Sequence, residues 1–240
     1  MAKNILKILA VFVIGTVGGI FADQILWPYF IERPLFYQYR LEQSPVYVTE
    51  RKETTMYIQE NFALREAVEK VEKVVIGVKT KTKTGEVLEG SGLVVTSDGL
   101  IITLASLVPQ GSEFYFFIDG KWPNYQILKR DLTNNLALIK VEGSGLSTVG
   151  FADLEKTKLG ERIFLIGMDF STSTPQKIVN EGIISFFDED SIQTNIFDQS
   201  SVSGSPLFNI EGRAVGLNVV DKDGKVSTIP ITLIRPFIGL

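Results

Sequence analysis

The stretch that decides the fold is Ile192-Gln-Thr-Asn-Ile-Phe-Asp-Gln-Ser-Ser-Val-Ser-Gly-Ser-Pro-Leu-Phe-Asn209. Apolar runs typical of strands flank it, Val179 to Phe187 before it and Arg213 to Val220 after it. The stretch itself is polar, and Gly204 and Pro206 near its end are residues that tight turns favour. The pattern therefore predicts a tight polar elbow between two strands.

Short runs rich in Val, Ile and Thr continue on both sides of the elbow and indicate strands rather than helices. The first group comprises Val74 to Lys83, Glu86 to Thr96, Leu100 to Thr103, Glu113 to Ile118, Trp122 to Leu128 and Leu136 to Val141. The second group comprises Arg162 to Gly167, Lys177 to Phe187, Ser191 to Thr194, Arg213 to Val220 and Val226 to Ile231. We expect an all-β fold of two antiparallel six-stranded barrels, about residues 74–145 and 146–235, with a cleft between them.

Three local patterns add detail to this domain. Asp119-Gly120 lies between two predicted strands and is a hairpin signal. The alternation of Thr and Lys from Lys79 to Thr84 predicts an exposed strand edge guarded by charge. Before the first strand, Asn61 is a candidate N-cap for a helix from Phe62 to Glu72. One face of that helix is apolar and consists of Leu64, Ala67, Val68 and Val71.

The N-terminal segment has the composition of a membrane span. Ile8 to Ala22 is uncharged and mostly apolar, and with Ile5 and Leu6 it nears the about 17 to 25 residues that cross a bilayer. Lys3 and Lys7 precede the span and aromatic residues follow it. This arrangement predicts a single-pass anchor in the inner or cell membrane, with the N-terminus in the cytoplasm and the domain outside it. A cleaved signal peptide, with Ala22 at the small-residue site, is the alternative.

These patterns divide the chain into three parts. Residues 1–31 form the cytoplasmic tip, the transmembrane anchor and an interfacial segment. Residues 32–61 mix Pro, charge and aromatics without a clean period and form a stalk. Residues 62–240 form the two-barrel domain.

Composition narrows the chemistry further. The chain of 240 residues contains no histidine and no cysteine, and its formal net charge is −4. It therefore has no disulfide, no thiolate nucleophile, no imidazole base and few ligands for zinc, so we expect neither a cofactor nor a metal site. The weak negative charge gives no reason to expect nucleic acid as a partner. Asp188-Glu-Asp190 is interpreted as a solvated acidic hairpin tip, with a cation site as the weaker reading.

The elbow resembles the nucleophile loop G-N-S-G-G-P-L of trypsin-like serine peptidases of the HtrA/DegP type, and Ser203 takes the nucleophile position. Glu89 to Thr103 resembles the block that precedes the family's catalytic histidine, and Asp131 to Lys140 resembles the block that contains its aspartate. Further similar blocks follow in the family's order at Gly167 to Phe170, Glu181 to Ser185, Ala214 to Asn218 and Thr228 to Ile231. The resemblance covers about residues 62–235 and implies a trypsin-like fold, here without the PDZ domain that most HtrA proteins carry.

The departures from the family pattern fall on the catalytic positions. Ser106 stands in place of the histidine, Asn135 in place of the aspartate, and Ser201 in place of the glycine of the oxyanion hole, which Ser201 and Ser203 would form. A Ser-His-Asp triad needs the imidazole, because it accepts and returns a proton near neutral pH. We expect Asn135 to pack as a neutral amide close to Ser106, and Ser203 to be a vestigial nucleophile.

The resemblance therefore implies a membrane-anchored, catalytically inactive peptidase homologue outside the cytoplasm. The partners that it implies are a peptide or protein segment in the cleft between the barrels and the membrane around the N-terminal helix, with a homo-oligomer left open. One alternative is an active serine endopeptidase with an unconventional base, such as a lysine; Lys140 and Lys177 are the nearest marked candidates. Another is a scaffold subunit of an active peptidase.

Overall fold

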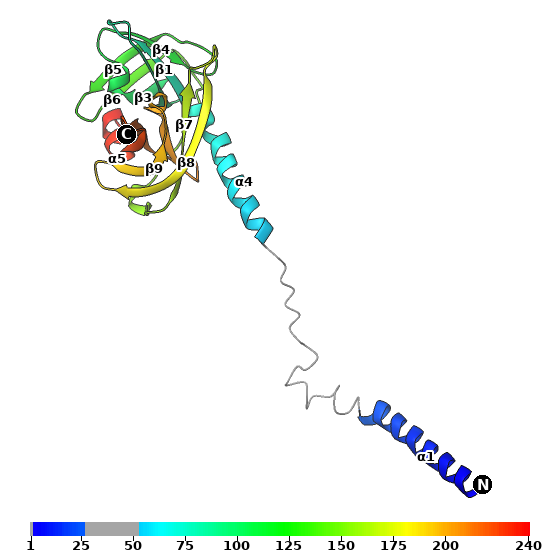
Figure 1. Ribbon diagram of the computed structural model, residues 1–240. Coiled ribbons are helices and arrows are strands. Elements are labelled where there is room, and N and C mark those ends of the chain that lie inside the picture. The colour runs from blue at the N-terminus through cyan, green and yellow to red at the C-terminus, as the bar shows by residue number, and fades with distance from the viewer. Residues whose placement is uncertain (1, 27–52) are drawn as a thin grey trace. The chain divides into compact units, whose positions relative to one another are not determined.

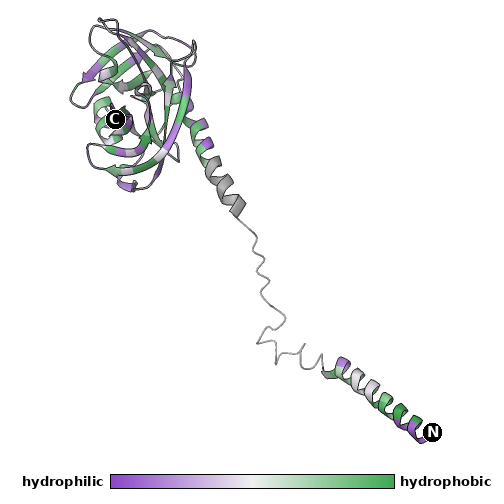
Figure 2. Ribbon diagram, viewed as in Figure 1, coloured by the Kyte–Doolittle hydropathy of each residue, from purple (hydrophilic) through white to green (hydrophobic). Residues whose placement is uncertain are grey.

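The computed structural model describes residues 2–26 and 53–240, and the chain separates into two compact units, Met1–Thr54 and Thr55–Leu240. In the first unit, the α-helix α1 (Ala2–Phe21) continues as a π-helical turn, η1 (Ala22–Leu26). The segment Lys3–Ile25 has a mean hydropathy of 2.3. It is long and apolar enough to cross a bilayer, and it also fits a signal sequence. Figure 2 shows the apolar character of this helix. Most of the predicted stalk lies outside the described residues.

The second unit is built mainly of antiparallel strands (Figure 1). The first six-stranded sheet has the order β4-β1-β2-β3-β6-β5. Its strands are β1 (Val75–Lys81), β2 (Val87–Val94), β3 (Leu100–Leu104), β4 (Glu113–Phe117), β5 (Tyr125–Asp131) and β6 (Leu136–Val141). The second sheet closes into a barrel of order β10-β11-β12-β9-β8-β7. Its strands are β7 (Arg162–Asp169), β8 (Gln176–Phe187), β9 (Ile192–Phe197), β10 (Pro206–Asn209), β11 (Ala214–Val220) and β12 (Lys225–Pro230).

The predicted trypsin-like two-sheet fold is thus confirmed, with one difference. The first sheet is a half-barrel, because β4 and β5 form its two edges and do not pair. Aromatic rings fill the space between these edges: the ring of Tyr125 lies 5.1 Å from that of Phe116 and 6.0 Å from that of Phe114. Ring packing therefore replaces the hydrogen bonds that would close the barrel.

Two details of this sheet correct the predictions. Asp119 and Gly120 do form a tight turn with positive φ of 45° and 77°, but they close only a single bridge between Ile118 and Lys121. The strands on either side pair with other neighbours, so the turn does not make a hairpin ladder. The predicted edge at Lys79 is also wrong, because β1 pairs with both β2 and β4 and lies inside the sheet.

Strand β7 joins the two sheets through its two faces. Ile163 and Leu165 point into the closed barrel, and the alternate residues Phe164, Ile166 and Met168 belong to the larger core that fills the first sheet. This follows from the two-residue period of a strand, whose successive side chains face opposite sides. Both faces of β7 are therefore buried, one in each of two hydrophobic clusters, and the larger cluster joins the two sheets.

Helices flank the strands at both ends of this unit. Helix α4 (Glu53–Val71) packs its predicted apolar face on the larger core, with Ala67 and Val71 buried. It begins at Glu53, so the predicted N-cap at residue 61 is wrong and that residue lies inside the helix. Helix α5 (Ile231–Ile238), which the sequence did not predict, inserts Ile234 and Phe237 into the same core. Figure 1 shows α5 between the strands of the two sheets.

Candidate functional site

The elbow leaves β9, passes through a 3-10 turn, η5 (Ser200–Val202), and enters β10. Gly204 has a φ of 77°, in the left-handed region that favours glycine. A Cβ at this position would also lie against the Ser91 carbonyl oxygen and 2.9 Å from Oγ1 of Thr103. Conformation and close packing both require glycine here, which explains the Ser-Gly pair of the sequence.

Hydrogen bonds fix the elbow to both sheets. The Ser91 N–H of β2 donates to the Ser203 carbonyl at 2.9 Å, and the Gly204 N–H donates to the Asn218 carbonyl of β11 at 2.7 Å. Ser91 is itself held, because its carbonyl accepts from the Thr103 hydroxyl at 2.6 Å and its hydroxyl accepts from the Met168 N–H. Ser203 therefore lies at the seam between the two sheets.

A buried polar network lies beneath the elbow. Asn218 donates from Nδ2 to Oγ of Ser205 at 2.9 Å, and its Oδ1 accepts from Oγ1 of Thr228 at 2.7 Å. These three residues are at most 2% exposed. Because a buried polar group costs free energy unless it is paired, the closed network fixes the relative positions of the elbow, β11 and β12.

No sequence motif indicates this network. The available signal was Ser205, which stands where the resembling loop G-N-S-G-G has its last glycine. A hydroxyl at a buried turn position needs a partner. Asn218 and Thr228 were recognised only as parts of closing strands, and no spacing in the sequence brings them to Ser205.

Ser106 and Asn135 are brought together in the first sheet. Ser106 lies in the short 3-10 turn η3 (Ala105–Leu107) after β3, and its N–H donates to Oδ1 of Asn135 at 2.8 Å. The Ala105 N–H donates to the Asn135 carbonyl at 3.0 Å. Asn135 has a φ of 53°, a left-handed conformation that asparagine tolerates better than most residues. It is half-buried, and Ser106 is exposed.

The turn at Ser106 and the elbow meet at β2. A Cβ on Gly90 would lie 2.7 Å from the Ser203 carbonyl oxygen and against the side chain of Leu107, the neighbour of Ser106. The fold therefore gathers the three positions at one seam. Within residues 2–26 and 53–240, however, neither the Ser203 nor the Ser106 hydroxyl forms a hydrogen bond with a protein group.

The 3-10 turn determines what the backbone at Ser201 and Ser203 can bind. The Ser203 N–H donates to the Ser200 carbonyl at 3.0 Å, and the Val202 N–H donates to the Gln199 carbonyl at 3.1 Å. In a planar trans peptide the N–H points away from the C=O. The Ser200 carbonyl faces the Ser203 N–H, so the Ser201 N–H of the same peptide points away from that carbonyl. The N–H groups of Ser201 and Ser203 therefore do not converge on one point.

Val202 anchors this turn in the core. Its side chain is fully buried in the closed barrel, and a Cβ on Gly167 would approach Cγ1 of Val202 to 2.9 Å. The resembling family loop has asparagine at this position. An apolar side chain gains from this burial, by about 1.5–3 kcal/mol for a residue of this size. The burial of Val202 therefore favours the turn as it stands.

Neither marked lysine has the burial that a neutral base requires. The ammonium of Lys140 contacts Asp98, 2.6 Å from Oδ2, and Lys177 is exposed on β8. Hydrogen bonds from Lys140 and from the Thr96 hydroxyl hold the pKa of Asp98 below its ordinary value.

In the part of the chain that the structure describes, no cluster of side chains could hold a metal ion. Oδ1 of Asp188 accepts the N–H groups of Asp190 and Ser191, so it caps its own turn.

Comparison with known proteins agrees with this arrangement. The model of the trypsin-like peptidase domain family matches residues 90–217, more than half of the chain. This chain belongs to the trypsin-like peptidase family. The match extends from the middle of β2 into β11 and so includes Ser106, Asn135 and the elbow.

Relatives of the HtrA/DegP type share modest identity with the chain. A probable periplasmic serine endoprotease DegP-like of Pseudomonas putida is 33% identical over 140 residues, which cover 54% of this chain and 28% of that protein. The corresponding protein of Halomonas elongata is 30% identical over 138 residues. Serine protease HTRA1 of Xenopus laevis is 33% identical over 165 residues, 62% of this chain and 35% of that protein. The chain thus matches about a third or less of the length of these relatives.

Proposed function

We propose that this chain is a peptidase homologue of the HtrA type that does not hydrolyse peptides and that binds a protein segment at the seam between its sheets. The observation that carries the proposal is the hydrogen bond from the Ser203 N–H to the Ser200 carbonyl. It occupies a donor that acyl transfer requires, because the tetrahedral intermediate needs N–H groups directed at its oxyanion.

The absence of a base supports the same conclusion. A serine hydroxyl is a weak nucleophile unless a neighbouring group removes its proton. The chain contains no histidine, and Ser106 and Asn135 carry no group that accepts a proton near neutral pH. A lysine base would have to be buried and neutral near Ser203, whereas Lys140 is engaged with Asp98 and Lys177 is exposed.

Binding of a protein segment is supported by what the seam retains. The contacts of Ser91, Gly204 and Asn218 hold the elbow where the two sheets meet, and the buried network is complete. The relatives are serine endoproteases by name, and such proteins bind polypeptide before they cleave it. A homologue that keeps this framework without the chemistry can hold a segment and release it intact.

A fluorophosphonate probe tests the proposal on the full chain in detergent. The probe reacts with activated serines, so we expect no labelling of the wild type and none of Ser203→Ala, while a DegP-like relative labels in the same assay. Labelling that is lost in Ser203→Ala would show an active enzyme with an unconventional base and would contradict the proposal.

We also propose that Lys3–Ile25 remains as a membrane anchor, with the second unit outside the cytoplasm. The support is the length and hydropathy of the helix and the two lysines at its N-terminal end, Lys3 and Lys7. Protease added to intact spheroplasts should then remove the domain, and mass spectrometry of the protected fragment should find residues 3–25. A mature protein that begins after Ala22 would instead identify a cleaved signal peptide.

A further inference from the structure

The outer face of strands β4, β1 and β2 carries side chains in three rows. The pairing register places Lys81 between Glu113 and Val87, Lys79 between Tyr115 and Glu89, and Gly77 between Phe117 and Ser91. The first two rows point away from the core, because the alternate residues of β1, Val78 and Thr80, are buried. The third row is covered, since the ring of Phe170 lies over Gly77 and Ser91 is fully buried. The site at Ser203 uses none of the side chains of the first two rows.

A hollow of about 580 Å³ opens on this face, lined by Lys79, Thr80, Lys81, Val87, Tyr115 and Trp122. The ring of Trp122 leans on Phe117 at 5.0 Å and on Tyr115 at 6.4 Å between ring centroids, and these rings form one wall. Trp122 and Val87 are 49% and 50% exposed. Large apolar side chains that gather with this much exposure indicate a binding surface, because folded proteins seldom leave contiguous apolar patches uncovered.

The cations on this face differ in their partners. The ammonium of Lys79 lies 2.8 Å from Oε1 of Glu89 and over the ring of Phe170 at 5.6 Å. Lys81, in contrast, forms no ion pair with any residue in the ranges 2–26 and 53–240. The carboxylate of Glu113, the neighbour of Lys81 in the pairing register, lies 3.4 Å from the Tyr115 hydroxyl. The hollow therefore combines an apolar wall with one cation at its rim that forms no ion pair in the described residues.

We propose that this hollow binds an extended protein segment, which places a bulky apolar side chain against Trp122 and Tyr115 and a carboxylate beside Lys81. The volume lies within the range of ligand pockets, about 300–1,000 Å³. Tyr115 stands in the row of Lys79, which lies about 7 Å from the row of Lys81 along β1. An extended ligand repeats its own side chains at the same spacing. An acidic residue two positions from an apolar one therefore matches the face.

Position and charge favour a protein segment over a membrane surface. Val87 lies on β2 four residues before Ser91, about 13 Å along the strand from the contact with the elbow. Lys79 and Lys81 balance Glu89 and Glu113 on this face, so it has no excess of positive charge to attract an anionic bilayer. The inference goes beyond the seam at Ser203 and holds whether or not that serine reacts.

Fluorine NMR of the full chain labelled with 5-fluorotryptophan tests the proposal. The chain has two tryptophans, Trp27 and Trp122, so Trp27→Phe assigns the two signals. The probe is the capped peptide Gly-Ser-Phe-Ser-Asp-Ser-Gly. We expect it to shift the Trp122 signal in a saturable manner, and we expect peptides with Phe replaced by Ser or Asp replaced by Lys to bind about tenfold more weakly.

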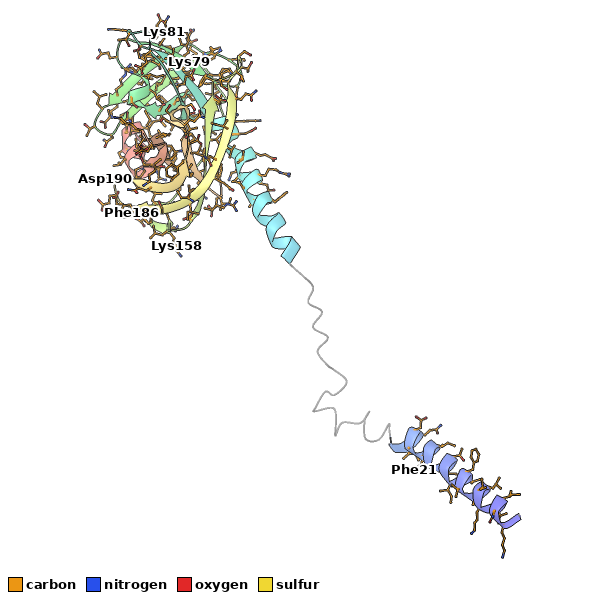
Figure 3. All side chains as sticks on the ribbon, viewed as in Figure 1. Phe21, Lys79, Lys81, Lys158, Phe186 and Asp190 are labelled. Atoms are coloured by element: carbon orange, nitrogen blue, oxygen red, sulfur yellow. The ribbon has the colours of Figure 1, made fainter. Side chains whose placement is uncertain are left out.

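A pair of charge reversals supplies the matched control. Lys81→Glu should weaken the probe about tenfold and favour the peptide that carries Lys in place of Asp. Lys158→Glu, the same change at the opposite end of the domain (Figure 3), should leave binding unchanged. Both lysines are exposed, so neither change should unfold the protein.

Three results would overturn the proposal. They are the absence of a saturable shift up to millimolar probe, equal binding by the peptide without Phe, and equal weakening by Lys81→Glu and Lys158→Glu. A Trp122 shift caused by phosphatidylglycerol vesicles and not by the peptide would assign the face to a lipid surface instead.

Discussion

The two sides of the seam differ from the motifs of the HtrA type in different ways. On the first sheet, the Ser106 N–H donates to Oδ1 of Asn135 at 2.8 Å, and both residues differ from those of the family motif. On the closed barrel, Ser203 keeps its residue type, but the backbone around it forms a 3-10 turn. One side differs from the motif in its side chains, and the other keeps the serine but in a turn that already bonds the Ser203 N–H.

The difference indicates which change is easier to reverse. New side chains at residues 106 and 135 would enter a backbone that already joins the two positions. Reversal at the elbow requires rotation of the Ser200–Ser201 peptide while the buried Val202 holds the turn in place. We therefore expect the elbow to be the stronger barrier to catalysis.

The largest expected effect is on activity. Ser106→His with Asn135→Asp should restore a base and its orienting carboxylate, whose loss costs about 10⁴ in kcat in trypsin. This double variant should still cleave casein hardly at all, because the closed turn removes oxyanion donors worth about 10²–10³ in rate. Addition of Ser201→Gly should give measurable cleavage, since glycine permits the rotated peptide.

The order of these variants distinguishes the two sides. Ser106→His alone should be inactive, and Ser203→Ala in the triple variant should abolish cleavage. If the double variant cleaves casein as fast as the triple variant, the elbow is no barrier, and the comparison fails.

A smaller effect concerns the stability of the elbow. Gly204→Ala should lower the free energy of unfolding by about 2–4 kcal/mol, because alanine resists the left-handed conformation and its Cβ meets Ser91 and Thr103. Gly120→Ala is the matched control, with the same φ of 77° but no atom within 4 Å of the new Cβ. It should cost about 1 kcal/mol. Equal losses in urea denaturation would show that close packing at the elbow adds nothing.

The smallest effect is expected at residue 135. Asn135→Asp keeps an acceptor for the Ser106 N–H, so stability at pH 7 should change by less than about 0.5 kcal/mol. Asn135→Gly keeps the left-handed backbone but loses the acceptor, at about 0.5–1.5 kcal/mol, and Asn135→Ala should lose more because it adds strain. Thermal melts of the three variants give the order.

The Asn135→Asp variant also has a defined pH dependence. The Ser106 N–H favours the ionised form of the introduced carboxyl, which lowers the pKa of that carboxyl in the folded state. Its contribution to stability is then present above the pKa of the unfolded chain and is lost as pH falls through the folded pKa. Stability that rises as pH falls below about 5 would mean that the carboxylate is desolvated, contrary to the half-buried position of the asparagine.

Much of this fold could be predicted from the sequence because the determining signals are local. Period-two runs located most strands, and the Asp119-Gly120 turn was recognised from two residues. The apolar face of α4 was recognised from its helical spacing. Strand β10 was missed because Pro206 and its short length mask the pattern, and α5 was missed because Pro236 interrupts a helix of eight residues.

Features that depend on distant contacts could not be predicted in the same way. The 3-10 turn at Ser200 exists because Val202 fits against Gly167, and the sequence gives no sign of that contact. The gap between β4 and β5 depends on where Tyr125 packs. The motif located Ser106, Asn135 and Ser203, and only the structure gives their hydrogen bonds.

Helix α5 has a consequence for how the chain is made. Its residues Ile231, Ile234 and Phe237 complete the core of the first sheet, although they follow the last strand of the second. A ribosome therefore releases the first sheet long before the chain that finishes its core has been synthesised. Strands β1 to β6 must wait, with apolar surface uncovered, until residues beyond 230 emerge. Folding of this domain is expected to be completed only after nearly all of it has left the exit tunnel.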